Sequence, residues 1–117
     1  MNVQAFSTCP PTLPPPKWLE HDGVNISWDA RRADINGEPL TLDRRTFALL
    51  YFFVSNKGRA LSRQQILDNV WGMDSRHIED RTIDVYVRRV REVLAAHGRV
   101  YLLRTVRGCG YCFGGEV

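Results

Sequence analysis

The chain has 117 residues, of which 44% are hydrophobic and 25% charged, and its formal net charge is +3 at pH 7. This length and composition predict one globular domain with a modest core. No apolar run is long enough to span a membrane and no basic start precedes an apolar stretch, so neither a membrane protein nor a secreted one is expected. Three cysteines, an odd number, are typical of a reducing compartment, and we expect a cytoplasmic protein.

Residues 1–20 are expected to form a flexible tail ahead of a single domain at residues 21–117. The run CPPTLPPP at residues 9–16 excludes a helix or a central strand and favours the extended polyproline II conformation. Such a segment is typical of a linker, and a proline-rich recognition motif is the alternative.

A small antiparallel sheet is predicted after the tail. The segment VNISW at residues 24–28 alternates apolar and polar side chains, the pattern of a half-buried strand. The pair Asn36-Gly37 is a strong signal for a two-residue hairpin turn. Pro39 cannot donate a backbone hydrogen bond, so its strand is expected at the edge of the sheet or near a strand end.

The first helix is predicted to begin after Asp43, a good N-cap, and to end at Gly58. Leu42 and Phe47 are placed to form a hydrophobic staple across its start. Its body is apolar on most sides, so other elements must cover it on two sides.

The second helix is predicted to begin with a capping box formed by Ser62 and Gln65. Its apolar side chains face inward, Trp71 among them, and Gly72 stops it. A short loop at residues 73–78 follows.

A helix over residues 79–96 has two faces of opposite character. One face is an apolar stripe that belongs in a core: Ile83, Val87, Val90 and Leu94. The other face carries Thr82, Val85, Tyr86 and Arg89, flanked by Arg81, Arg88 and Arg91. This second face can dock on phosphates and touch base edges in the major groove. A generic basic surface is the plainer alternative.

A β-hairpin is predicted after Gly98, with strands at residues 100–106 and 111–113 joined by a flexible tip. The hairpin presents Arg104 and Arg107.

Cys109 and Cys112 of this hairpin spell a CxxC motif. A redox motif of this type needs its first thiol at a helix N-terminus, and a zinc site needs two further ligands, which the histidines do not supply at ligand spacing. We therefore expect no metal and no cofactor, and a redox- or metal-responsive protein is a rival hypothesis. No nucleophile, base and orienting group form a recognisable arrangement, so an enzyme is not expected.

Sheet, two helices, basic helix and basic hairpin in this order predict an α+β fold, the winged helix-turn-helix, with three helices and a C-terminal β-hairpin wing. Four segments resemble the effector domain of OmpR/PhoB-type transcriptional regulators: LDRRTFALL (42–50), GRALSRQQILDNVWG (58–72), IEDRTIDVYVRRVREVL (78–94) and RTVRGCGYCF (104–113). The resemblance covers residues 24–113. It implies sequence-specific binding of double-stranded DNA for transcription regulation, with the helix at 79–96 in the major groove and the wing at 104–113 at the minor groove.

The resemblance implies roles for the residues of the basic helix. Arg89 would read a base, with guanine as the expected one. The same face would be lined by Thr82, Val85 and Tyr86. Phosphates would be held by Arg81, Arg88 and Arg91.

Outside this helix, the resemblance implies that Arg107 at the wing tip enters the minor groove. Arg104 would join it there or pair with an acidic residue inside the domain. The loop that holds Met73, Asp74 and Arg76 lies where relatives contact RNA polymerase, which makes polymerase a second expected partner.

Plainer interpretations stand beside some of these roles. Trp71 is expected in the core rather than as a base-stacking residue. Asp84 is expected to orient Arg81 or Arg88, and accepting a hydrogen bond from cytosine is its alternative. Tyr86 either contacts the DNA or packs on the surface of the domain.

One such domain offers a small interface, so two protomers are expected to bind in tandem on half-sites about one helical turn apart. Most family members also carry a receiver domain, which the residues ahead of the sheet are too few to form. This leaves an excised effector domain or a stand-alone regulator. The rival function is a winged-helix protein-interaction module, an antirepressor or adaptor, that uses the same basic face.

Overall fold

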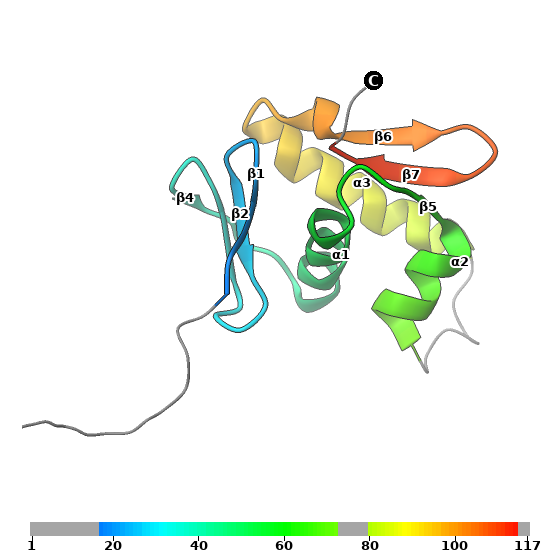
Figure 1. Ribbon diagram of the computed structural model, residues 1–117, viewed down its shortest axis with the longest axis horizontal. Helices are drawn as coiled ribbons and strands as arrows, with labels where there is room; N and C mark the ends of the chain where they lie inside the picture. The colour runs from blue at the N-terminus through cyan, green and yellow to red at the C-terminus, as the bar shows by residue number, and fades with distance from the viewer. Residues whose placement is uncertain (1–16, 73–79, 115–117) are drawn as a thin grey trace, which may run out of the picture.

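The computed structural model describes residues 17–72 and 80–114 (Figure 1). A four-stranded antiparallel sheet stands at the N-terminal side of the fold, with its strands in the order β1-β2-β3-β4. Its strands are β1 (Leu19–His21), β2 (Val24–Ser27), β3 (Arg32–Ile35) and β4 (Glu38–Pro39).

The predicted hairpin around Asn36-Gly37 is confirmed. Both turn residues have positive φ angles, 53° and 84°, which the tight turn between β3 and β4 requires. Pro39 lies in β4 at the edge of the sheet, as predicted. The sheet begins at Leu19, which is paired with Ile26, so it starts two residues before the expected domain boundary at residue 21. Three residues are too few to show an alternating pattern, and only their pairing with β2 defines β1.

Helix α1 (Arg44–Ser55) is the central element of the fold. Asp43 caps its N-terminus, because its side chain accepts a hydrogen bond from the Thr46 amide. The helix packs against the N-terminal sheet on one side and against α3 on another (Figure 1), so its apolar side chains, Leu49, Leu50 and Phe53 among them, are almost completely buried. The predicted need for cover on two sides is confirmed.

Helix α2 (Arg63–Ile66) continues directly into a wider helical turn, η1 (Leu67–Trp71). The predicted capping box is confirmed: the Ser62 side chain accepts from the Gln65 amide, and the Gln65 side chain accepts from the Ser62 amide. Gly72 follows the helix with φ of +59°. Trp71 is only 6% exposed, which confirms its core position.

Helix α3 (Asp80–Ala96) places its predicted apolar stripe in the core. Ile83, Val87, Val90 and Leu94 are each at most 1% exposed. The opposite face is therefore the one left for contact with a partner.

The second sheet has the order β5-β7-β6 and carries the C-terminal hairpin. Its strands are β5 (Ala60–Ser62), β6 (Leu103–Val106) and β7 (Gly110–Phe113). Residues 100–102 were expected in the first hairpin strand but form a short 3-10 turn, η3 (Val100–Leu102). Gly110 belongs to β7 rather than to a flexible tip, because it is paired with Ser62 of β5 and Val106 of β6. A Cβ atom at this position would lie 2.1 Å from the Leu61 carbonyl oxygen. This glycine allows the wing to pair closely with the strand ahead of α2.

Candidate nucleic-acid interface

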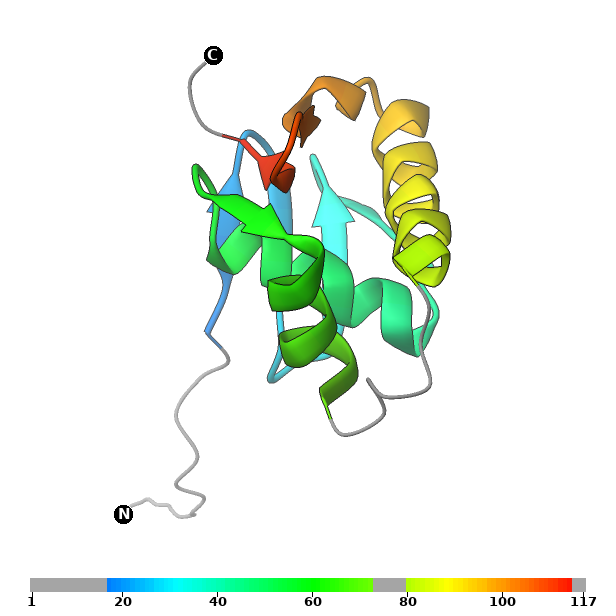
Figure 2. The same cartoon turned by 90° about the vertical axis from the view of Figure 1, so that its right-hand side faces the viewer.

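Helix α3 offers one exposed face beside the β6–β7 hairpin (Figure 1). Figure 2 shows α3 at the edge of the fold. Val85 is 42% exposed and the Arg89 side chain 50% exposed, whereas Thr82 and Tyr86 are half-buried. All four lie on one side of α3, with Tyr86 bordering the core, so the structure brings together the residues expected to face bases.

Tyr86 and Arg89 form a stack on the end of η1. The Tyr86 ring meets the Trp71 ring edge-on, with 5.4 Å between centroids and an interplanar angle of 74°. The Arg89 guanidinium lies 4.7 Å above the Tyr86 ring, and its Nη1 atom is 4.0 Å from Asp43 Oδ1. Tyr86 thus packs on the domain and holds the Arg89 guanidinium against its ring. The contact with Asp43 is at the outer limit of an ion pair, so an acceptor on DNA can replace it.

The three arginines expected to hold phosphates differ in their surroundings. Arg81 and Arg88 are exposed. Arg91 is half-buried and turned toward the wing, where its Nη2 donates to Thr105 Oγ1 at 2.7 Å and its Nε to the Leu103 carbonyl at 3.4 Å. Arg91 therefore joins α3 to β6, a role that the sequence does not indicate.

Asp84 lies at the meeting point of α2, α3 and β7. Its Oδ1 accepts a hydrogen bond from the Tyr111 hydroxyl at 2.6 Å and from Arg63 Nε at 3.2 Å. The prediction that Asp84 orients Arg81 or Arg88 is wrong, because its hydrogen-bond donors come from other elements, Arg63 from α2 and Tyr111 from β7. Its pKa reflects the site: burial opposes ionisation, but the bonds from Tyr111 and Arg63 and the nearby cations outweigh it and lower the pKa of Asp84.

The contact with Asp84 also raises the pKa of both hydrogen-bond donors, Tyr111 and Arg63. Burial and the hydrogen bond to Asp84 raise the pKa of the Tyr111 hydroxyl, so it stays protonated and able to donate. The guanidinium groups of Arg63 and Arg91 each lie 5.4 Å from the centre of the Tyr111 ring. Sequence reasoning missed Arg63, Tyr111 and Thr105 as parts of the interface. They lie 14 to 27 residues from their α3 partners, so no local pattern could have paired them.

The wing presents its two arginines differently. Arg107 is exposed in the turn between β6 and β7. Arg104 is half-buried, and its Nη2 lies 3.5 Å from Cys112 Sγ on the neighbouring strand. Among the described residues, Arg104 thus contacts a sulfur atom rather than the acidic residue considered as its alternative.

The remaining expected features do not belong to this face of α3 or to the arginines of the wing. Met73, Asp74 and Arg76 lie outside the described residues. Cys109 is exposed and Cys112 buried, and both are free thiols. Within residues 17–72 and 80–114, no three His, Cys, Asp or Glu side chains are grouped to hold a metal ion. In this same part of the chain, no helix is long and apolar enough to cross a membrane.

Three helices, an N-terminal sheet and a C-terminal hairpin define the class of winged helix-turn-helix domains, as predicted. Residues 37–113 match the family described as "Transcriptional regulatory protein, C terminal". The chain belongs to this family of OmpR/PhoB-type DNA-binding domains of transcriptional regulators.

Two relatives and one solved structure illustrate the similarity. The response regulator ArlR of Staphylococcus haemolyticus is 42% identical over 93 residues, which are 80% of this chain and 42% of the relative. The phosphate regulon regulatory protein PhoB of Escherichia coli is 39% identical over 95 residues, 81% of this chain and 41% of the relative. The chain thus spans only 42% and 41% of the length of these relatives. The DNA-binding domain of Klebsiella pneumoniae RstA, solved with the RstA box, has a TM-score of 0.72 and 26% identity, covering 86% of this chain and 99% of that domain.

Proposed function

We propose that this domain regulates transcription by binding duplex DNA at specific sequences, with α3 in the major groove and the wing at the minor groove. One observation carries the proposal: Val85 and Arg89 stand exposed on the single face of α3 that the core leaves free, beside the exposed Arg107 of the wing. The RstA complex supports it, because a similar domain was solved bound to its DNA box. Such a role places the protein in the bacterial cytoplasm, at the nucleoid.

Within this proposal, Arg89 reads a guanine and Val85 meets a thymine methyl, while Thr82 and Tyr86 line the groove. Arg81 and Arg88 hold phosphates. Arg91 reaches a phosphate only by leaving its bonds to the wing, so we assign it first to positioning the wing. Arg107 enters the minor groove, and Arg104 supports the strand behind it.

Two further partners are proposed. Two protomers in tandem follow from the small interface that one such domain offers. RNA polymerase follows from the family resemblance alone, which assigns the contact to the loop that holds Met73, Asp74 and Arg76.

The test is selection of bound duplexes from a random pool, followed by titration of the selected duplex and a scrambled one at two salt concentrations. A recurring motif, preferably two direct repeats a helical turn apart, with a steep loss of affinity at higher salt, would support the proposal. Equal and weak affinity for both duplexes would overturn it and favour the protein-interaction module.

A further inference from the structure

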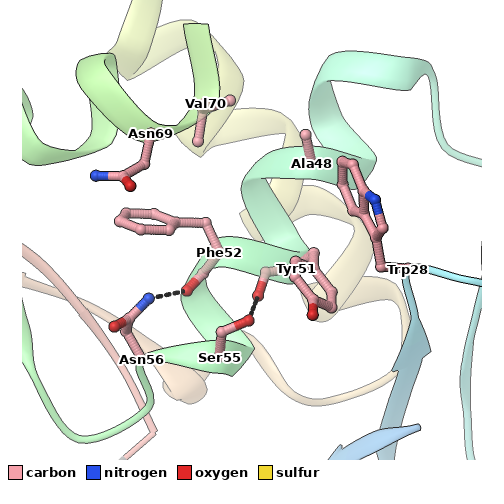
Figure 3. A pocket seen from close by; sticks show the side chains of 8 residues that line it. All are labelled: Trp28, Ala48, Tyr51, Phe52, Ser55, Asn56, Asn69 and Val70. Carbon is pink, nitrogen blue, oxygen red and sulfur yellow. Dashed lines mark hydrogen bonds between the residues drawn. The ribbon is translucent and has the colours of Figure 1, made fainter. Parts of the chain in front are cut away.

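An aromatic pocket lies between the N-terminal sheet, α1 and η1, and the proposed interface residues do not line it. Its volume is about 490 Å³. Figure 3 shows the side chains that line it, which are Trp28, Ala48, Tyr51, Phe52, Ser55, Asn56, Asn69 and Val70. None of these side chains carries a charge. DNA binding leaves the pocket unused, because it contains no residue of α3 or the wing.

Trp28 and Tyr51 form one wall of the pocket. Their ring centroids are 5.2 Å apart with an interplanar angle of 47°, and Trp28 is 38% exposed. The Arg31 guanidinium lies 4.0 Å from the centre of the indole ring and holds it in place. Neighbouring aromatic rings of this kind provide the flat, apolar surface on which polyproline II segments dock.

The same two residues supply unused hydrogen-bond donors. Within the described part of the chain, neither the Trp28 indole N–H nor the Tyr51 hydroxyl has a hydrogen-bond partner, whereas Ser55 donates to the Tyr51 carbonyl and Asn56 to the Phe52 carbonyl (Figure 3). A polyproline II segment has no internal hydrogen bonds, so its carbonyl groups need donors from outside. Trp28 and Tyr51 carry two such donors at this wall.

Lys17, the residue directly after the proline-rich segment, is bound close to Trp28. The Lys17 backbone amide donates to Asp29 Oδ2 at 3.3 Å, and Asp29 directly follows Trp28 in the chain. Residues 9–16, CPPTLPPP, therefore join the domain next to the pocket. Attachment at this point gives the segment an effective local concentration on the order of millimolar, far above that of a free peptide in a cell.

The segment also matches the pocket chemically. Residues 1–16 contain no Asp, Glu, Lys or Arg, as the uncharged lining requires. With three residues per turn, polyproline II places apolar side chains on two adjacent edges, Pro10, Leu13 and Pro16 on one and Pro11 and Pro14 on the next. The third edge carries Cys9, Pro15 and the only hydroxyl side chain of the segment, Thr12.

We propose that residues 9–16 dock in polyproline II conformation in the pocket between Trp28, Tyr51 and Phe52 of the same chain. The two apolar edges lie on the rings, and the Trp28 indole and the Tyr51 hydroxyl donate to backbone carbonyls of the segment. The domain thereby holds its own N-terminal segment beside α1 and η1, on a surface separate from the proposed DNA-binding face.

The test follows the Trp28 indole N–H resonance by NMR in the full chain, with the resonance assigned from Trp28→Phe. Replacing Pro11, Leu13 and Pro14 together by Ser should move this resonance, because the segment loses its apolar edges. The matched control replaces Cys9, Thr12 and Pro15 by Ser and should leave the resonance in place. Identical Trp28 resonances in all three proteins would overturn the proposal. The buried Trp71 indole serves as the internal reference.

A second experiment adds the segment as a separate peptide. It distinguishes docking in the pocket from an indirect effect of the substitutions on the Trp28 resonance. A synthetic peptide of residues 8–17, titrated into the variant with the altered apolar edges, should restore the Trp28 resonance. Tyr51→Phe, which keeps the ring and removes the hydroxyl, should weaken this peptide about fivefold, the effect of one lost hydrogen bond. A peptide that leaves Trp28 unchanged at millimolar concentration would overturn the proposal. So would a wild-type resonance that moves on dilution, which would assign the pocket to the tail of a second copy.

Discussion

The hydroxyl of Tyr111 donates a hydrogen bond of 2.6 Å to Asp84 Oδ1, which joins the wing to the helix proposed to read DNA. Arg63 of α2 donates to the same oxygen atom at 3.2 Å. One carboxylate therefore connects the three elements that have to keep a constant arrangement if α3 and the wing are to enter neighbouring grooves. This relationship, the hydrogen-bonded carboxylate of Asp43 and the proposed roles of the arginines lead to five predictions.

Tyr111→Phe should lower the free energy of unfolding by about 1 kcal/mol. The ring stays packed, since Tyr111 is 5% exposed, while the hydroxyl loses its hydrogen bond to Asp84 and the longer one that it accepts from Arg63 Nη2 at 3.4 Å. Urea unfolding of the variant and the wild type measures the difference. Tyr101→Phe is the comparison at an exposed site, where the hydroxyl donates a hydrogen bond to Asp22, and it should cost less stability than Tyr111→Phe. An unchanged midpoint for Tyr111→Phe would show that the bond contributes nothing to stability.

The domain should lose stability in acid partly through Asp84. Its pKa lies below the ordinary value of 3.8 in the folded state, so the unfolded chain takes up a proton first as the pH falls. The contribution of this carboxylate is therefore complete above about pH 4 and disappears as the pH falls through the folded-state pKa. Asp84→Asn should be less stable at neutral pH and should lose less further stability below pH 4. The check is urea unfolding across a pH series.

Protonation of Asp43 should also lower the stability of the domain in acid, as protonation of Asp84 does. Hydrogen bonding by the Thr46 side chain, partly opposed by burial, lowers the pKa of Asp43. Asp84→Asn should still lose free energy of unfolding as the pH falls below about 4. This remaining pH dependence is expected to decrease when Asp43→Asn is added. If the slope of the double variant matched that of the wild type, neither carboxylate would explain the acid sensitivity.

Arg89→Ala should reduce discrimination between DNA sequences, with a cost of about 1–3 kcal/mol on the preferred site. The guanidinium lies 4.7 Å from the centre of the Tyr86 ring and the side chain is half exposed, which leaves it accessible to a base edge. Arg88→Ala is the matched control: it should weaken all duplexes alike and reduce the salt slope by about 1, because a phosphate contact carries no sequence information. Unchanged affinity of Arg89→Ala for the preferred site would disprove the assignment of the recognition residue.

Arg91→Ala should act through the wing. Its guanidinium donates to Thr105 Oγ1, so Thr105→Val, which keeps the branched side chain and removes the acceptor, should reproduce much of the loss of DNA affinity without changing the salt slope. Titrations of both variants at two salt concentrations make the comparison. A reduced salt slope in Arg91→Ala alone would instead show that Arg91 leaves the wing and binds a phosphate.

Local signals predicted much of this fold because they depend on residues close together in the chain. The caps at Asp43 and Ser62 and the turn at Asn36-Gly37 are all present. The buried stripe of α3 followed from helical spacing. By contrast, β1 was missed because its three residues form a strand only by pairing with β2. Residues 100–102 have strand-like composition but turn as a 3-10 segment between α3 and β6.

The sequence by itself determined the fold class, the family and the free face of α3. Hydrophobic periodicity and the order of the motifs are properties of neighbouring residues, so they can be recognised without knowledge of tertiary contacts. The tertiary structure alone decided what each polar side chain of that face contacts. It directs Arg91 to Thr105 and Asp84 to Arg63 and Tyr111, while Arg89 stays exposed on Tyr86. The physical reason is distance along the chain: a hydrogen bond between residues 14 or more positions apart depends on how whole elements pack, which no local pattern encodes.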